Sequence, residues 1–207
     1  RCRPVVIGDA CCMAYAAQVA KKVSGLDLKI RAIMDIREAQ FQYGVIDVYD
    51  MGIVRAGDIP GDANAPKPFG VGACALGGEA AFRYVVKVIE LAMAGEVDAT
   101  ITNALSKEAI NMAGHHYSGH TEIYAEYTHT QKYSMMLAHN DLRVVHVSTH
   151  VSLRQACDLV KKERVLDVIR IANEGCKAIG IAEPKIAVAG LNPHCGEGGM
   201  FGTEELE

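Results

Sequence analysis

The stretch PVVIGDACCMAYAAQVAKKVSGLDLKIRAI, residues 4–33, contains the pattern that decides the fold. It begins with a short run of mainly β-branched residues at 4–9 and ends with another apolar run at 28–33, and both are typical of strands. A longer helical pattern lies between them at 11–24. Strand, helix and strand in this order predict an α/β fold.

The same alternation continues through the rest of the sequence. Further strands are predicted at 44–50, 98–103, 134–139, 142–149 and 184–192. Further helices are predicted at 72–94, 106–113, 121–128, 152–157 and 161–180. Apolar residues at three- and four-residue steps over 79–93 predict one buried helix face, made of Phe82, Val85, Val86, Ile89 and Met93. The alternation implies a mostly parallel or mixed sheet covered on both faces, with ligands bound beyond the carboxyl ends of its strands.

Composition limits the class of function. Half of the residues are hydrophobic, the formal net charge is −4, and no Lys/Arg cluster carries interleaved aromatics, which argues against a nucleic-acid partner. No apolar run approaches the ~20 residues of a membrane span, so we expect a soluble protein with a small-molecule ligand and no membrane partner. The seven cysteines are odd in number and scattered, apart from Cys11 and Cys12, which favours the reducing cytoplasm.

The stretch TNALSKEAIN, residues 102–111, is the first candidate for anion binding. Ser106 is a plausible N-cap, and Lys107 enters the helix beside it. The free N–H groups of a helix start and a lysine charge both attract a phosphate or carboxylate. The alternative is an ordinary capped helix with a solvated lysine.

The stretch AGHHYSGHTEIYAEYTHT, residues 113–130, is the second candidate. Gly119 lets the backbone approach a ligand closely, and the side chains of His120 and Thr121 can donate to a phosphate or carboxylate. The alternative is a turn in which Thr121 is the N-cap of the following helix.

A third candidate is the histidine at the end of VVHVSTH. His146 and His150 lie about 13 Å apart along a strand, too far to share one metal ion. His150 is the better candidate ligand because it falls where the strand gives way to a helix near Ser152. The alternative is a hydrogen-bonded structural histidine.

The fourth candidate is the final stretch KIAVAGLNPHCGEGGMFGTEELE, residues 185–207. Pro193 fixes the backbone before His194, which follows the predicted strand. Four glycines allow backbone amides to face a bulky anionic ligand: Gly196, Gly198, Gly199 and Gly202. Their spacing is not the dinucleotide-binding G-x-G-x-x-G, and the alternative is a flexible connector. If two strand ends meet, His150 and His194 can bind one divalent metal, with a third ligand from elsewhere.

These four motifs, in this order and spacing, resemble the 4-hydroxythreonine-4-phosphate dehydrogenase family. The motif AGHHYSGHTE most resembles the branch of four-carbon acid sugar phosphate dehydrogenases, which act on 4-phospho-D-threonate and 4-phospho-D-erythronate. The resemblance implies a three-layer α/β/α fold like that of isocitrate and isopropylmalate dehydrogenases, with two interleaved subdomains around a cleft. It also implies a homodimer with a shared active site.

The resemblance further implies NAD-dependent oxidation of a secondary alcohol in a phosphorylated four-carbon hydroxy acid, then decarboxylation to a three-carbon ketone phosphate. A divalent metal, Zn, Mg, Mn or Co, would be bound by His150 and His194, and the phosphorylated substrate by His120 and Thr121. We expect Lys107 to be catalytic, as a phosphate contact or proton carrier. We expect NAD beside the glycine-rich loop, at Gly196, Gly198 and Gly199.

The family's N-terminal glycine motif, its third metal histidine and its later substrate and nucleotide contacts have no counterpart in residues 1–207, so we expect a partial chain. One alternative is 4-hydroxythreonine-4-phosphate dehydrogenase of pyridoxal phosphate biosynthesis, and another is a dihydrodiol carboxylate dehydrogenase. A different class would be a non-catalytic metal- or anion-binding protein.

Overall fold

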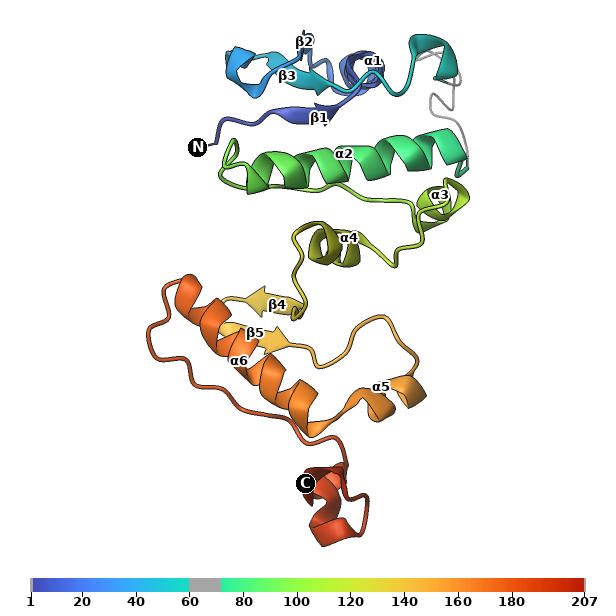
Figure 1. Ribbon diagram of the computed structural model, residues 1–207. Coiled ribbons are helices and arrows are strands. Elements are labelled where there is room, and N and C mark those ends of the chain that lie inside the picture. The colour runs from blue at the N-terminus through green and yellow to red at the C-terminus, as the bar shows by residue number, and fades with distance from the viewer. Residues whose placement is uncertain (1, 60–71, 207) are drawn as a thin grey trace. The chain divides into compact units, whose positions relative to one another are not determined.

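The computed structural model describes residues 2–59 and 72–206 (Figure 1). The chain forms two compact units, one ending at His129 and the other beginning at Thr130. None of the helices among the described residues is long and apolar enough to cross a membrane.

A three-stranded parallel sheet opens the first unit. Strands β1 (Val6–Gly8) and β2 (Lys29–Ile33) both pair with β3 (Val45–Asp50), and α1 (Ala10–Ser24) connects β1 to β2. Gly25, with a left-handed φ of 72°, caps the end of α1. Each element lies within two residues of its predicted bounds, and the parallel sheet confirms the α/β class.

A partly buried ion pair links β2, at one edge of this sheet, to the central strand β3. The register places Arg31 opposite Asp47, and Arg31 Nη1 lies 3.1 Å from Asp47 Oδ1. The second carboxylate oxygen accepts hydrogen bonds from the N–H groups of Gln40 and Phe41, which follow the 3-10 helix η1 (Ile36–Glu38). Asp47 is 2% exposed, so these contacts replace the water that its carboxylate has lost.

A second buried carboxylate, Asp9, follows β1. It is 1% exposed and accepts hydrogen bonds from the N–H groups of Ile53 and Val54, just before the 3-10 helix η2 (Ala56–Asp58). The Tyr84 hydroxyl donates to the same carboxylate at 2.6 Å. Burial and this contact raise the pKa of Tyr84 above its usual value. Asp9 therefore ties the carboxyl end of β1 to a helix that comes much later in the sequence.

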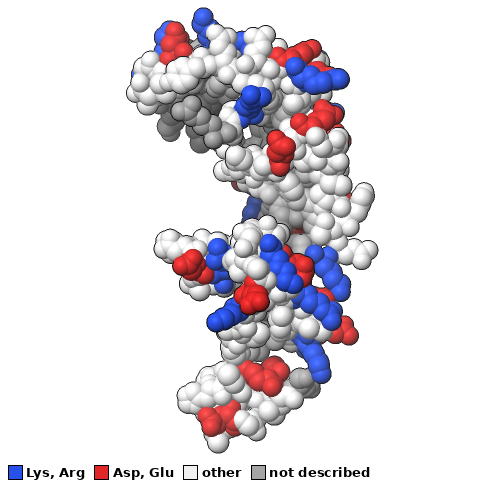
Figure 2. Space-filling model, turned by 90° about the vertical axis from the view of Figure 1, so that its left-hand side faces the viewer, with Lys and Arg blue, Asp and Glu red and all other residues white. Residues whose placement is uncertain are grey.

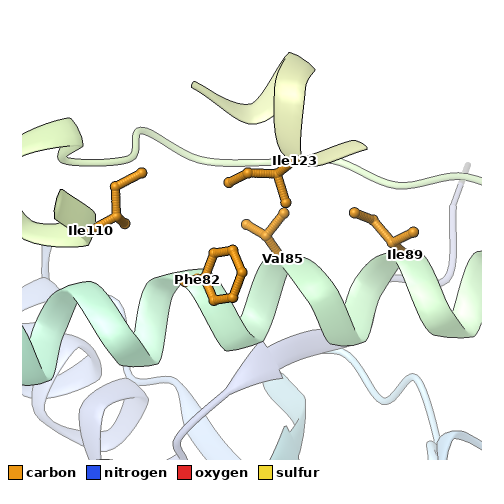
Figure 3. Close-up of a cluster of buried hydrophobic side chains, with 5 residues drawn as sticks. All are labelled: Phe82, Val85, Ile89, Ile110 and Ile123. Carbon is orange, nitrogen blue, oxygen red and sulfur yellow. The ribbon is translucent and has the colours of Figure 1, made fainter. Parts of the chain in front are cut away.

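That helix, α2 (Ala75–Met93), carries the main apolar face of the unit. In Figure 1 it lies between the sheet and two short helices, α3 (Lys107–Met112) and α4 (His120–Tyr127). Figure 3 shows the cluster between them, formed by Phe82, Val85, Ile89, Ile110 and Ile123. The predicted face is confirmed except at its end, because Met93 is the last residue of α2 and is 63% exposed.

The second unit contains an antiparallel pair and two helices. Strands β4 (Met136–His139) and β5 (Leu142–Val145) pair with each other, and α5 (Leu153–Leu159) and α6 (Lys162–Ala178) follow. Two short 3-10 helices complete it, η3 (Pro193–Gly199) and η4 (Glu204–Leu206).

Two of the predicted strands are wrong. Residues 98–103 and 184–192 are neither helix nor strand, since neither segment finds a pairing partner among the described residues. Their apolar side chains remain open to solvent, with Ile101 89% and Val188 60% exposed. The prediction over 142–149 was too long because pairing stops at Val145. The segment 55–71, whose three prolines and three glycines predict a loop, lies largely outside the described residues.

Candidate functional site

Lys107 stands at the start of α3. Ser106 caps this helix as predicted, because its Oγ accepts a hydrogen bond from the N–H of Ala109 at 3.2 Å. Ala109 and Ile110 are buried, whereas Lys107 is exposed. The packing of α3 therefore fixes the backbone of Lys107 and leaves its ammonium group accessible to a ligand.

The side chain of Lys107 reaches the beginning of α4. A Cβ atom added to Gly119, the N-cap of α4, would lie 4.0 Å from Lys107 Cε. His120 and Thr121 are the first two residues of α4 and are half-buried. Thr121 is not the N-cap, so that alternative was wrong. The fold brings a lysine, an imidazole, a hydroxyl and free helix N–H groups together, a combination suited to phosphate.

Glu122 is a residue of this site that sequence reasoning did not single out. Its Oε2 atom is buried and has no hydrogen-bond partner among the described residues. The same atom lies 3.7 Å from the position of a Cβ on Gly119. A buried acceptor that lacks a donor fits a hydroxyl group of a ligand. In the sequence, Glu122 could have been recognised as the acidic residue that directly follows His120 and Thr121.

His150 lies in the loop between β5 and α5, beyond the strand end where the sequence had placed it. Its backbone is left-handed, with φ 55°, and the residue is exposed. Arg164 of α6 binds the backbone just before His150, because its Nε donates to the Val147 carbonyl at 2.9 Å. Its Nη2 also donates to the Tyr133 carbonyl, before β4, at 3.1 Å. A cavity of about 480 Å³ adjoins this segment and is lined in part by Thr149 and Arg164.

His194 lies in η3, and its ring contacts a carboxylate. Nδ1 of His194 is 3.0 Å from Glu197 Oε2, and the side chain is 74% exposed. Because Nδ1 contacts the Glu197 carboxylate, Nε2 is the ring nitrogen that remains available to bind a ligand. Metal-binding histidines are commonly oriented by a carboxylate in this way.

The backbone around His194 is strained. Residues 194–198 all have left-handed φ values, between 44° and 82°. Three of them are not glycine: His194, Cys195 and Glu197. This conformation costs roughly 1–2 kcal/mol for each non-glycine residue, so the surrounding contacts must hold it in place.

The glycines predicted to face NAD differ in their surroundings. Gly196 is buried, and a Cβ there would lie 2.7 Å from the Gly202 carbonyl oxygen, so the loop's own packing requires this glycine. An added Cβ on Gly198 would meet nothing within 4 Å. At Gly199 it would make ordinary contacts of 3.5 Å and 3.8 Å. Contact between these residues and NAD stays a prediction.

The two candidate metal ligands have suitable chemistry but do not form a complete site. Imidazoles suit a divalent transition metal, and Nε2 of His194 is available for one. Among residues 2–59 and 72–206, however, no group of three or more His, Cys, Asp or Glu side chains could hold a metal ion. His150 and His194 as a metal pair, and a third ligand, therefore stay predictions.

Charges of both signs are interspersed on the face shown in Figure 2. This face therefore presents neither a broad basic nor a broad acidic surface among its described residues.

Comparison with known proteins identifies the family. A family model described as "Pyridoxal phosphate biosynthetic protein PdxA" matches residues 1–207. The chain belongs to the PdxA family. A curated PdxA relative, the D-threonate 4-phosphate dehydrogenase of Cupriavidus necator, is 41% identical over 207 residues, covering all of this chain and 58% of the relative.

Solved structures agree with this assignment. A 4-hydroxythreonine-4-phosphate dehydrogenase from Burkholderia phymatum matches 100% of this chain and 58% of its own, with a TM-score of 0.78 and 40% identity. A terephthalate 1,2-cis-dihydrodiol dehydrogenase from Burkholderia xenovorans matches 98% of this chain and 58% of its own, with a TM-score of 0.58 and 26% identity. The resemblance to the 4-hydroxythreonine-4-phosphate dehydrogenase family is confirmed, and the chain spans little more than half the length of these relatives.

Proposed function

We propose that this chain is part of a dehydrogenase that oxidises the secondary alcohol of a phosphorylated four-carbon hydroxy acid, with D-threonate 4-phosphate as the preferred candidate. The alcohol loses a proton and transfers a hydride to NAD, and the resulting keto acid then loses carbon dioxide and takes up a proton to give a three-carbon ketone phosphate. The observation that carries the proposal is 41% identity, over the whole chain, to a relative named for that substrate.

The residues beside Gly119 support a phosphorylated substrate. Lys107, His120 and Thr121 offer donors to phosphate oxygens at the start of α4, where the helix dipole also favours an anion. Binding a phosphate away from the reacting carbon supplies energy for positioning the alcohol. In this proposal Lys107 either contacts the phosphate directly or carries a proton.

His150 and His194 are the proposed ligands of a divalent metal. When bound, a metal ion lowers the pKa of a substrate hydroxyl and stabilises the charge left by decarboxylation, and the nicotinamide accepts the hydride. The chain's own contribution is to present the imidazoles, and Glu197 orients one of them. The homodimer, the two interleaved subdomains and the shared active site belong to the same proposal.

The test is NADH formation by the whole protein with D-threonate 4-phosphate and unphosphorylated D-threonate, with and without divalent metal. We expect turnover only of the phosphorylated acid, and only with metal. His194→Ala should lower kcat, whereas Thr121→Ala should mainly raise KM. The exposed His139→Ala variant is the control and should match the wild type. Metal-independent turnover, or equal rates with both acids, would count against the proposal.

A second candidate is oxidation of 4-hydroxythreonine 4-phosphate, because a solved relative at 40% identity carries that name. Adding this compound to the assay separates the two substrates by their kcat/KM values. The dihydrodiol relative provides a third comparison, since a preference for an unphosphorylated cyclic diol would leave Lys107 without a phosphate to bind.

A further inference from the structure

We infer that Glu205 is a positioning residue, which closes the base of the loop that carries His194 and so fixes the direction of its imidazole. This loop, residues 190–202, is called the His194 loop below. The inference rests on the proposed function, in which His194 binds a metal.

The carboxylate of Glu205 binds two consecutive backbone N–H groups at the start of the loop. Its Oε1 accepts from Leu191 at 2.8 Å and from Asn192 at 2.7 Å. Its Oε2 accepts from the side-chain amide of Asn192 at 2.9 Å. Glu204 accepts a further hydrogen bond from the same amide at 2.6 Å. Backbone and side-chain contacts with Asn192 lower the pKa of Glu205, so the charged acceptor persists at neutral pH.

The glycines of the loop allow this closure. A Cβ on Gly196 would lie 3.2 Å from Glu205 Oε2, and a Cβ on Gly202 would lie 2.3 Å from the Asn192 amide nitrogen. An added Cβ would therefore crowd the Glu205 carboxylate at Gly196 and would force the Asn192 amide to move at Gly202. The glycines therefore serve the loop's internal packing as well as any ligand.

The closure also explains how the strained segment persists. His194 begins the run of left-handed residues two positions after Asn192, and unfavourable backbone of this kind relaxes when its ends are released. Glu205 anchors the segment that precedes the run, and Gly196 inside the run packs under Gly202. Without the anchor, the imidazole would sample many directions and a metal would bind more weakly.

The experiment compares Glu205→Ala, Glu205→Gln and the control Glu183→Ala in the whole protein. Glu183 is an exposed glutamate of the same unit, outside the His194 loop. Two quantities are measured: hydrogen exchange of the Leu191 and Asn192 amides by NMR, and the affinity for Co²⁺ from its absorption spectrum. For Glu205→Ala we expect exchange at least about tenfold faster and Co²⁺ affinity about 10–100-fold weaker. Glu205→Gln keeps one carbonyl acceptor and should recover part of both losses.

Wild-type exchange and wild-type Co²⁺ affinity in Glu205→Ala would overturn the inference. Equal losses in Glu183→Ala would overturn it too, because they would reflect charge alone. If the wild type itself does not bind Co²⁺, the proposed metal role of His194 fails. The exchange rates then test only whether Glu205 closes the loop: faster exchange in Glu205→Ala supports the closure, and unchanged exchange overturns it.

Discussion

Replacing Gly78 by alanine should separate α3 from α2. Gly78 is buried near the start of α2, and an added Cβ would lie 1.9 Å from the Ala109 carbonyl oxygen and 2.8 Å from the Ile110 nitrogen. Both are backbone atoms, which cannot rotate away, so α3 must move by more than an ångström. Overpacking costs typically 1–3 kcal/mol, and a contact this short belongs at the upper end. Alanine regains about 1 kcal/mol of helix propensity, which leaves a net destabilisation of about 2 kcal/mol.

The free energy of unfolding is measured by urea denaturation, followed by far-ultraviolet circular dichroism. The control is Gly175→Ala in α6, where the added Cβ would make an ordinary contact 3.7 Å from Met136 Cε. That substitution should stabilise the protein by about 0.5–1 kcal/mol. The reasoning is refuted if the free energy of unfolding of Gly78→Ala equals that of the wild type, or if it rises as in the control. Because α3 begins at Lys107, Gly78→Ala should also weaken binding of the proposed phosphorylated substrate.

Three further predictions concern the first unit. Tyr84→Phe removes the hydroxyl that donates to buried Asp9 and should destabilise the protein by about 1–3 kcal/mol in the same denaturation assay. Burial, with neighbouring charges and a hydrogen bond, raises the pKa of Cys12 to about 12, so mass spectrometry should find this thiol unmodified by iodoacetamide at about pH 8. Hydrogen bonds from Arg37 lower the pKa of Asp35 from 3.8 to about 2. Its stabilising contribution is thus complete above pH 3.8 and is lost as the pH falls through about 2, which an NMR titration of its carboxyl carbon should follow.

Each prediction has a result that contradicts it. Tyr43→Phe changes a fully exposed tyrosine and should leave stability unchanged, so equal losses in both tyrosine variants would remove the role of the buried hydrogen bond. Alkylation of Cys12 as fast as that of exposed Cys2 would show that burial does not protect it. An Asp35 midpoint at or above 3.8 would mean that the contact with Arg37 does not form in solution.

Local patterns were enough to predict most elements of the fold. The strands over 28–33 and 44–50 and the helix over 11–24 formed within one residue of their predicted bounds, because hydrophobic period and length distinguish the two types. The segments 98–103 and 184–192 carry the same apolar signal but form no strand. A strand depends on a pairing partner elsewhere in the sequence, and a local pattern does not identify that partner.

The same limit applies to the candidate site. Ser106 as a cap was predictable, because capping depends on residues three positions apart. The approach of Lys107 to Gly119 was not, because it depends on how α3 and α4 pack on α2. The contacts of Glu205 were also missed, since they join it to Leu191 and Asn192, which lie more than ten positions earlier in the sequence.

The Arg31–Asp47 pair has a consequence for how the sheet assembles. Side chains alternate between the two faces of a strand, so a slip of β3 by one residue would turn Asp47 to the opposite face. There it would lose Arg31 and the N–H groups of Gln40 and Phe41 together. Asp47 is 2% exposed, and leaving a buried polar group without its partners costs about 1–3 kcal/mol or more, a large part of the net stability of a typical domain. The Asp47 carboxylate therefore helps to specify the register of β3, since a sheet shifted by one residue would be less stable.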